Sequence, residues 1–330
     1  MGRCSWGIHF NIRKKKMKEF LEEDEKKLLL DIFHIYAPTN GEASLSIFLA
    51  KFLESQKIDF TMDAYNNIYS IKYPGEPILS AHQDCVGDLS CGKLANFVDI
   101  YDFDDIQVLK GNGNIGADDK IGIFLILLYL TKVNKNINFV FSTGEERSVP
   151  TGIKTIVSDI KELEGFKKAP YCIVLDRKNS GDIICKENDY GSKAFDDALS
   201  EIGKKYDYAS VKGGHSDTAT FSEYMNAANL SVGYYNPHTK TEFVIIQDMI
   251  NTFNYLCDII ENLPRDIPYE EKKKTTYNYP SYNGYKGYGY STYDDDYDVY
   301  GCYGNNNKKE KKKFENKKTF YDSDFTEIYD

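Results

Sequence analysis

The sequence lacks several features that would place it in common classes of protein. Its longest apolar run, Ile121–Leu130, falls short of the roughly 20 residues that a membrane-spanning helix needs. Seven cysteines include no C-x-x-C pair, which favours reduced thiols and a cytoplasmic location. A formal net charge of −10 argues against a general nucleic-acid binder, which needs a basic surface to displace phosphate counterions. We therefore expect neither a membrane nor a nucleic acid among the partners of this protein.

The two ends of the chain differ in composition from the part between them. After Pro264 the residues are mainly Tyr, Gly, Asn, Asp and Lys, with few aliphatic side chains to bury. Burial there cannot offset the entropy of ordering, so we expect 265–330 to be a disordered tail. The basic run Arg13–Lys16 precedes Met17, where an amphipathic pattern begins, and we interpret 1–16 as an extension upstream of the natural start. One folded domain, 17–264, lies between these ends.

Within that domain, helix-like and strand-like patterns alternate along the chain. Such alternation predicts an α/β fold with a largely parallel or mixed sheet. The apolar periodicity predicts helices over 18–36, 45–53, 120–131, 152–160, 193–204, 216–225 and 242–262. It predicts strands over 58–61, 68–73, 77–81, 106–109, 137–141, 171–175, 208–211 and 230–235.

Acidic residues and histidines gather where these predicted strands end. The carboxyl ends of strands in an open α/β sheet form the ligand crevice, so we expect these side chains to meet at one rim. Charged groups placed together beside buried strands repel one another unless a cation compensates them. The candidates are His82, the pair Asp118-Asp119, the pair Glu145-Glu146, Asp176 and His238, one group at each of five strand ends.

The chemistry of these five groups points to metal ions. Imidazole nitrogen and carboxylate oxygen are ligands that zinc accepts, and catalytic sites leave one position open for water. Five protein ligands with one shared carboxylate suit a pair of ions roughly 3.5–4 Å apart. The sequence thus predicts two divalent ions, zinc by preference, with cobalt or manganese as alternatives.

Five motifs in order resemble those of the co-catalytic zinc aminopeptidases, the metallopeptidase superfamily that includes the M28, M42 and M20 families. They are His82-x-Asp84, Gly116-Ala-Asp-Asp-Lys120, Thr143-Gly-Glu-Glu146, Leu175-Asp-Arg177 and Asn236-Pro-His-Thr239. The resemblance covers about 18–263 and implies a three-layer α/β/α sandwich with a mixed central sheet. It also implies that 17–264 is a metallopeptidase catalytic domain.

The resemblance implies a role for each candidate ligand. Asp118 would bridge both metal ions. His82 and Asp176 would complete one metal site, and Glu146 and His238 would complete the other. In this superfamily the residue pair that begins with Asp118 is joined by a cis peptide bond.

Two further carboxylates have implied roles beside the ligands. Asp84 would accept a hydrogen bond that fixes the tautomer of the His82 imidazole. Glu145 would act as the general base for water attack. Neighbouring residues on a strand point to opposite sides, which independently predicts different roles for Glu145 and Glu146.

The spacing of the motifs limits the size of the protein around the site. The interval from His82 to Asp118 leaves no room for the inserted domain of M42-type enzymes. That from Asp176 to His238 is too short for the lid of M20-type enzymes. We therefore expect a single catalytic domain without lid or large insertion. One departure from the motifs of the superfamily is Arg147, where small or apolar residues commonly follow the Glu pair.

These observations favour a cytoplasmic, metal-dependent aminopeptidase that acts on a peptide or small amide. A deacylase or carboxypeptidase with the same dimetal centre is an alternative, as is a non-enzymatic binding protein on a degenerate peptidase fold. The oligomeric state is not predicted.

Two other kinds of site were weighed against the metal centre. The segment Gly111–Gly116 fits the dinucleotide-binding pattern G-x-G-x-x-G, but it lacks the acidic residue expected about 20 positions later. Cys85 lies beside His82, yet adjacent chain residues rarely form a nucleophile–base pair, and we interpret this cysteine as a small buried residue.

Overall fold

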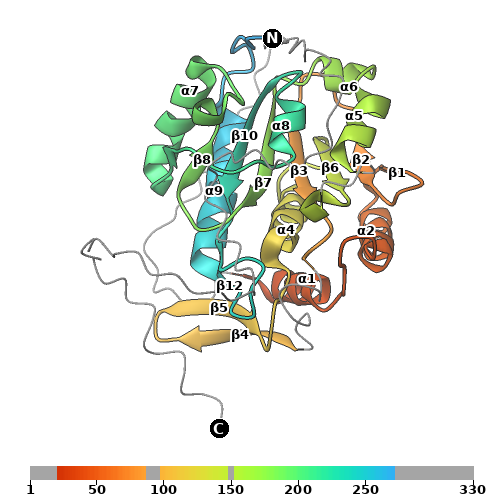
Figure 1. The fold of residues 1–330 in the computed structure, drawn as a ribbon, viewed down its shortest axis with the longest axis vertical. Helices are drawn as coiled ribbons and strands as arrows, with labels where there is room; N and C mark the ends of the chain where they lie inside the picture. The colour runs from red at the N-terminus through yellow and green to blue at the C-terminus, as the bar shows by residue number, and fades with distance from the viewer. Residues whose placement is uncertain (1–20, 87–96, 148–151, 272–330) are drawn as a thin grey trace, which may run out of the picture. The chain divides into compact units, whose positions relative to one another are not determined.

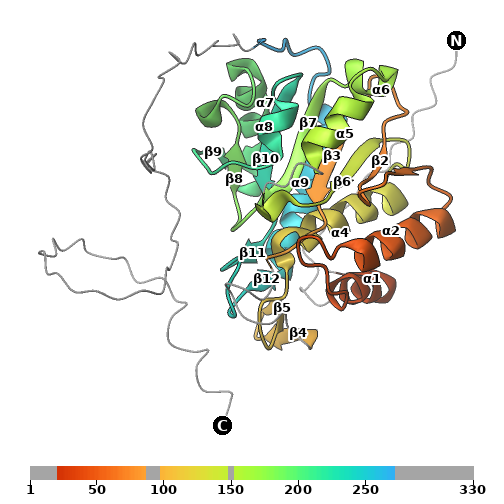
Figure 2. The same ribbon diagram turned by 45° about the vertical axis from the view of Figure 1, so that its right-hand side comes forward.

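The computed structural model describes residues 21–86, 97–147 and 152–271. Helices cover both faces of a large central sheet, and a smaller sheet lies beyond one end of it (Figures 1 and 2). This is the three-layer α/β/α arrangement that the sequence predicts. The strands of the two sheets are β1 Thr61–Met62, β2 Ile68–Ser70, β3 Ile78–His82, β4 Val98–Phe103, β5 Ile106–Gly111, β6 Asn138–Ser142, β7 Tyr171–Arg177, β8 Asp182–Ile184, β9 Ala209–Ser210, β10 Asn226–Ser231, β11 Tyr234–Tyr235 and β12 Phe243–Ile245.

Eight strands form the central sheet in the order β1-β2-β6-β3-β7-β10-β8-β9. The four middle strands, β6, β3, β7 and β10, run parallel, whereas β2 and β8 pair antiparallel with them. Strands β3 and β6 are buried along their whole length, as parallel strands covered on both faces are. The mixed sheet therefore confirms the predicted fold class.

Alternate residues of the middle strands face two different helical layers. Ile78 and Val174 pack in one apolar cluster with Ile156 of α5. Leu79 and Ile173, their chain neighbours, pack in the other, which includes α1, α2, α4 and α9. This two-sided burial holds the sheet rigid between its helices. The longer helices are α1 Glu23–Phe33, α2 Ala43–Ser55, α4 Ala117–Lys132, α5 Ile153–Ile160, α7 Lys193–Gly203 and α9 Ile246–Asn262, and the short ones are α6 Glu164–Lys167 and α8 Thr218–Phe221.

Four strands form a separate, four-stranded sheet in the order β11-β12-β5-β4. Its inner pair is antiparallel, with Val244 of β12 opposite Leu109 of β5, and both side chains are fully buried. Strand β5 leads into the turn before α4, and the loop between β11 and β12 carries His238. This sheet thus flanks two of the candidate ligands.

The prediction of one continuous strand over 230–235 is wrong, because this segment is divided between two sheets. Strand β10 ends at Ser231, and Tyr234 begins β11 in the other sheet. Gly233 between them has φ +90°, and a Cβ there would lie 2.6 Å from the Met249 amide nitrogen. A turn that only glycine accommodates therefore divides one apolar run between two sheets.

Other boundaries also differ from the prediction. The helix expected over 216–225 is only the short α8, in part because the Ser222 hydroxyl bonds the Ala219 carbonyl and ends the helix. The helix expected from residue 242 begins only after β12, whose residues are aromatic or β-branched. Strands β4 and β8 were not predicted.

Among the described residues, no helix combines the length and the apolar character that crossing a bilayer requires. The predicted extension 1–16 lies outside the described residues, as does most of the predicted tail. The four cysteines that the structure describes are free, as expected.

Candidate metal centre

Two histidines far apart in sequence contact opposite oxygens of one carboxylate. Nε2 of His82 lies 3.2 Å from Oδ1 of Asp118, and Nε2 of His238 lies 3.2 Å from Oδ2 of the same residue. Asp118 is 8% exposed, so water does not screen these contacts fully. Asp118 is the residue to which the resemblance assigns the bridging role, and that role stays a prediction.

Each histidine also contacts a second carboxylate. Oδ1 of Asp176 lies 3.5 Å from Nε2 of His82, and Oε1 of Glu146 lies 2.9 Å from Nε2 of His238. The five candidate ligands therefore form two groups, each with one histidine and one further carboxylate, joined through Asp118. Ligand atoms of His82, Asp118 and Glu146 all lie within 4.8 Å of one another, which is close enough for a shared ion.

Three of these side chains follow neighbouring parallel strands. His82 ends β3, Asp176 lies near the end of β7, and Glu146 follows β6. The rim predicted from strand ends is correct for them. Asp118 and His238 also meet this group, but they come from segments that flank the four-stranded sheet and not from ends of the central strands. Their positions depend on turns, because His238 has φ +63° and Asp118 has non-helical backbone angles at the start of α4.

Asp84 is completely buried and has more partners than predicted. Its Oδ1 lies 3.5 Å from Nδ1 of His82, close enough for an ion pair but without the predicted hydrogen bond, and it accepts a hydrogen bond of 3.0 Å from the Glu145 amide. Its Oδ2 accepts bonds from the Glu146 amide, at 3.3 Å, and from the Thr39 hydroxyl, at 2.7 Å. One carboxylate thus links the ring of His82 to the backbone of the glutamate pair.

The glutamate pair lies on a short 3-10 helix, Glu145–Arg147, and not on a strand. Strand alternation is therefore the wrong reason for separate roles. The contacts differ nonetheless, since Glu146 bonds His238 while Asp84 holds the amide of Glu145. Burial, and then the charge of Asp176, raises the pKa of Glu145 to about 10.

The charges of the cluster show what kind of ligand it fits. Burial, and then the neighbouring Asp118, raises the pKa of Asp176 to about 8. Burial alone would lower the pKa of His238, but hydrogen bonds with Asp118 and Glu146 raise it to about 11. Protons thus compensate crowded carboxylates in the metal-free protein. Divalent cations would remove that excess of negative charge, and the nitrogen and oxygen donors suit zinc.

Asp119 is a buried carboxylate whose role the sequence did not predict. The peptide bond between Asp118 and Asp119 is cis, as the resemblance implies. Oδ2 of Asp119 accepts a bond of 3.1 Å from the His82 amide, and Oδ1 accepts one of 3.1 Å from the Gly122 amide. These bonds tie β3 to α4. Asp119 also lies within ligand distance of His82 and Asp176, but both of its oxygens bond the backbone.

The glycine-rich turn before α4 does not resemble a phosphate site in its contacts. The carboxylate of Glu242 accepts bonds from its backbone amides, among them Gly116 at 2.7 Å and Ile115 at 3.0 Å. Those amides are the groups that would bind a dinucleotide phosphate. The structure therefore contradicts a dinucleotide site, and nothing in the local sequence pattern pointed to Glu242.

Cys85 is not placed to act as a nucleophile. Its side chain is 1% exposed, and its thiol donates to the Ala37 carbonyl oxygen at 3.0 Å. Burial raises the pKa of the thiol to about 12, so the reactive thiolate is not populated near neutral pH. The interpretation of Cys85 as a small buried residue is confirmed.

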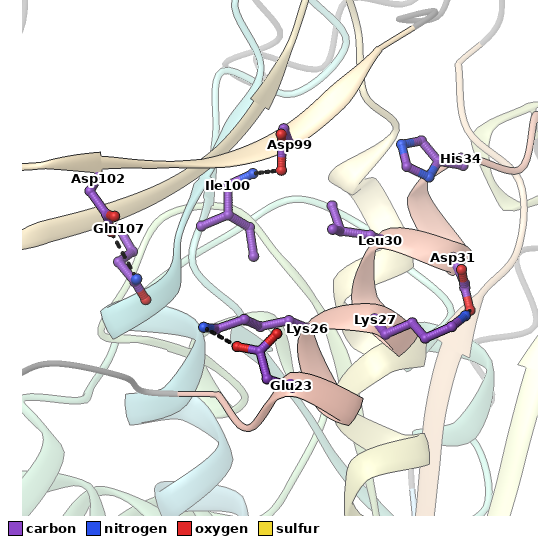
Figure 3. Close-up of a pocket in the computed structure, with 10 residues that line it drawn as sticks. All are labelled: Glu23, Lys26, Lys27, Leu30, Asp31, His34, Asp99, Ile100, Asp102 and Gln107. Carbon is purple, nitrogen blue, oxygen red and sulfur yellow. Dashed lines mark hydrogen bonds and ion pairs between the residues drawn. The ribbon is translucent and has the colours of Figure 1, made fainter.

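A cleft of about 500 Å³ between α1 and the β4–β5 hairpin contains none of the candidate ligands. Figure 3 shows that its two lysines lie beside acidic residues of the same helix, α1, with Asp99 and Asp102 of the hairpin on the other side. Lys26 pairs with Glu23 at 3.0 Å, and Lys27 pairs with Asp31. Surface pairs of this kind contribute little to stability.

Comparison with known proteins finds a partial sequence likeness and a shared fold. No protein-family model matches the chain. A LysW-lysine/LysW-ornithine hydrolase of Saccharolobus solfataricus is 26% identical over 168 residues, which are 51% of this chain and 43% of that protein. The match thus spans less than half the length of this curated relative.

Two solved structures share the fold over most of the chain. The TET1 peptidase of Pyrococcus horikoshii, which can assemble into a tetrahedron or an octahedral shell, aligns with a TM-score of 0.54 and 13% identity, covering 70% of this chain and 98% of that one. Aminopeptidase PepT of Bacillus cereus aligns with a TM-score of 0.53 and 14% identity, covering 72% and 97%. The chain therefore shares its fold with these two peptidases.

Proposed function

We propose that this protein is a metal-dependent hydrolase of peptide amide bonds with a two-metal centre. The observation that carries the proposal is the placement of His82 and His238 at 3.2 Å from opposite oxygens of Asp118. Asp176 and Glu146 would complete the two ligand sets. Crowded carboxylates and imidazoles of this kind are the donors that zinc prefers, with cobalt or manganese as alternatives.

When bound, a pair of divalent ions supplies Lewis-acid polarisation of the scissile carbonyl and lowers the pKa of water. The chain's own residues hold and orient the reacting groups. Asp84 sets the ring of His82 and, through two amides, the positions of Glu145 and Glu146. Such outer contacts fix ligand geometry before substrate arrives.

Glu145 is proposed as the general base. It would take one proton from the attacking water as the new C–O bond forms. It would then give that proton to the amine as the C–N bond breaks, so that Glu145 ends as it began. Without metal, burial and the charge of Asp176 raise the pKa of Glu145 to about 10, so Glu145 would be ionised, as a base must be, only with cations beside it.

Within this class we propose an aminopeptidase, supported by the shared fold of TET1 and PepT. A deacylase or carboxypeptidase is the second candidate, favoured by the partial likeness to a LysW-lysine/LysW-ornithine hydrolase. A binding protein without activity is less well supported, because all five ligand candidates and Glu145 are present. The cytoplasmic location stays a prediction.

Metal content and substrate preference together test the proposal. We expect the purified chain to bind two divalent ions and to hydrolyse aminoacyl amides faster than N-acyl amides. Glu145→Gln, which keeps the shape of the side chain, serves as the matched control for contaminating peptidases. Faster hydrolysis of N-acyl amides would favour the second candidate. Two bound ions without hydrolysis of either class would favour a binding protein.

A further inference from the structure

The turn that presents Asp118 is held by one side chain from a distant part of the chain. Glu242 is 2% exposed and accepts hydrogen bonds from four successive backbone amides. Its Oε2 receives those of Ile115 at 3.0 Å, Gly116 at 2.7 Å and Ala117 at 3.2 Å. Its Oε1 receives that of Asp118 at 3.4 Å. One carboxylate therefore defines the path of the backbone into the shared ligand.

The same side chain belongs to the segment that carries His238. Glu242 follows His238 by four residues and immediately precedes β12, which pairs with β5. We infer that Glu242 is a positioning residue that fixes Asp118 relative to His238 and so preorganises the half of the metal centre that contains His238. The inference rests on the proposed two-metal function and adds a residue to it.

The chemistry of the turn explains why a carboxylate is needed there. The first amides of a helix have no partner within the helix and carry partial positive charge. These buried amides must therefore find acceptors outside the helix, and Asn114 supplies a second one to the Gly116 amide at 2.8 Å. Gly116 itself adopts φ +65°, and a Cβ there would lie 3.0 Å from the Cys85 Cβ. A glutamine at 242 would lose the charge and turn an N–H₂ group toward backbone N–H groups.

The half that contains His82 has its own support. His82 ends a fully buried strand, and its amide is held by Asp119. Asp176 lies on the adjacent strand β7. None of these contacts involves Glu242. Because Asp118 belongs to both halves, loss of Glu242 should affect both, but it should weaken the half that contains His238 more strongly.

Titration of the full chain with Co²⁺, followed by visible absorption and calorimetry, tests this. In Glu242→Gln we expect the second ion to bind about tenfold or more weakly, while the first binds within about threefold of the wild type. Asp196→Asn is the matched control. Asp196 is 8% exposed and accepts bonds from the Lys186 amide at 3.2 Å and the Ser210 hydroxyl at 2.8 Å, in contacts that involve none of the candidate ligands. A merely structural role would lower the melting temperature of both variants and leave both cobalt steps unchanged.

Equal weakening of both ions, or of neither, would overturn the inference while leaving the hydrolase intact. Fewer than two ions in the wild type would overturn the inference together with the two-metal proposal. If Glu242→Gln does not fold, Asn114→Ala removes the other acceptor of the turn, and it should weaken the second ion in the same direction by a smaller factor. An unchanged second step in Asn114→Ala would then count against the inference.

Discussion

The two histidines of the site touch the same carboxylate but are built into the fold in different ways. His82 ends a buried strand, its side chain is 2% exposed, and its backbone amide bonds Asp119. The His238 side chain is 39% exposed and lies on a loop with a left-handed backbone. The first position follows from sheet packing. The second follows from turns and from Glu242, so the two halves should respond differently to mutation.

The largest effect on activity is expected from Glu145, the proposed base that serves both halves of the centre. Glu145 contacts neither histidine in the proposed ligand sets, so Glu145→Gln should retain both ions. Loss of the base should lower kcat for an aminoacyl amide by about 10²–10⁴-fold. Metal analysis and steady-state kinetics on the same sample check both parts. Near-normal turnover would refute the role of Glu145 as the base. It would also remove the reason to treat the two halves as parts of one catalytic site.

Removing one histidine at a time separates the halves directly. His238→Ala should lose one of two ions and destabilise the metal-free protein less than His82→Ala, because its ring is partly exposed although it also pairs with Asp118 and Glu146. His82→Ala should lose an ion and also leave buried carboxylates without a partner, which costs about 3–5 kcal/mol of unfolding free energy. Metal analysis and denaturant titration measure these effects. Equal destabilisation by both substitutions would contradict the inference that the fold depends more on His82 than on His238.

A smaller effect is expected from the carboxylate that connects the halves. Asp84→Asn should weaken metal affinity or activity by about 10–100-fold, because Asp84 orients His82 and also holds the amides of Glu145 and Glu146. Both ions should be affected to a similar degree, in contrast to Glu242→Gln. Thr39→Val removes only one donor to Asp84 and should have a weaker effect of the same kind. A change confined to one ion would show that Asp84 serves one half only.

The smallest expected effect is the coupling of metal binding to protons. In the metal-free protein burial, and then Asp118, raises the pKa of Asp176 to about 8, and hydrogen bonds with Asp118 and Glu146 raise that of His238 to about 11 despite burial. Ions must displace those protons, so affinity should rise as the pH rises from 6 to 8, with about one to two protons released. Calorimetry in buffers of different ionisation enthalpy measures this number. Release of no proton would contradict the raised pKa values.

The sequence predicted the central sheet and the ligands that depend on it. Apolar runs that end in His82, Asp176 and the glutamate pair are local patterns, and neighbouring parallel strands bring their ends together. The motifs also identified Asp118 and His238, although the sheet that flanks these two residues was not predicted. Its strand β12 reads as the start of a helix, and a single turn at Gly233 diverts β11 from the run before it.

Long-range polar contacts were beyond the reach of sequence patterns. Glu242 bonds amides that lie 124–127 residues away, and Asp119 bonds the His82 amide across 37 positions. Nothing in hydrophobic periodicity or residue spacing reports which buried carboxylate meets which backbone group. These contacts became visible only when the fold placed the segments side by side.

The four-stranded sheet has a mechanical consequence for the centre. Strand β5 runs into the turn that carries Asp118, and the loop that carries His238 runs into β12, its hydrogen-bonded neighbour. Any shift of this sheet against the central one would therefore carry both side chains together. Their mutual spacing would survive, whereas their separation from His82 and Asp176 would change. A ligand or partner that moved the β4–β5 hairpin would thus change the distance between the two halves of the centre.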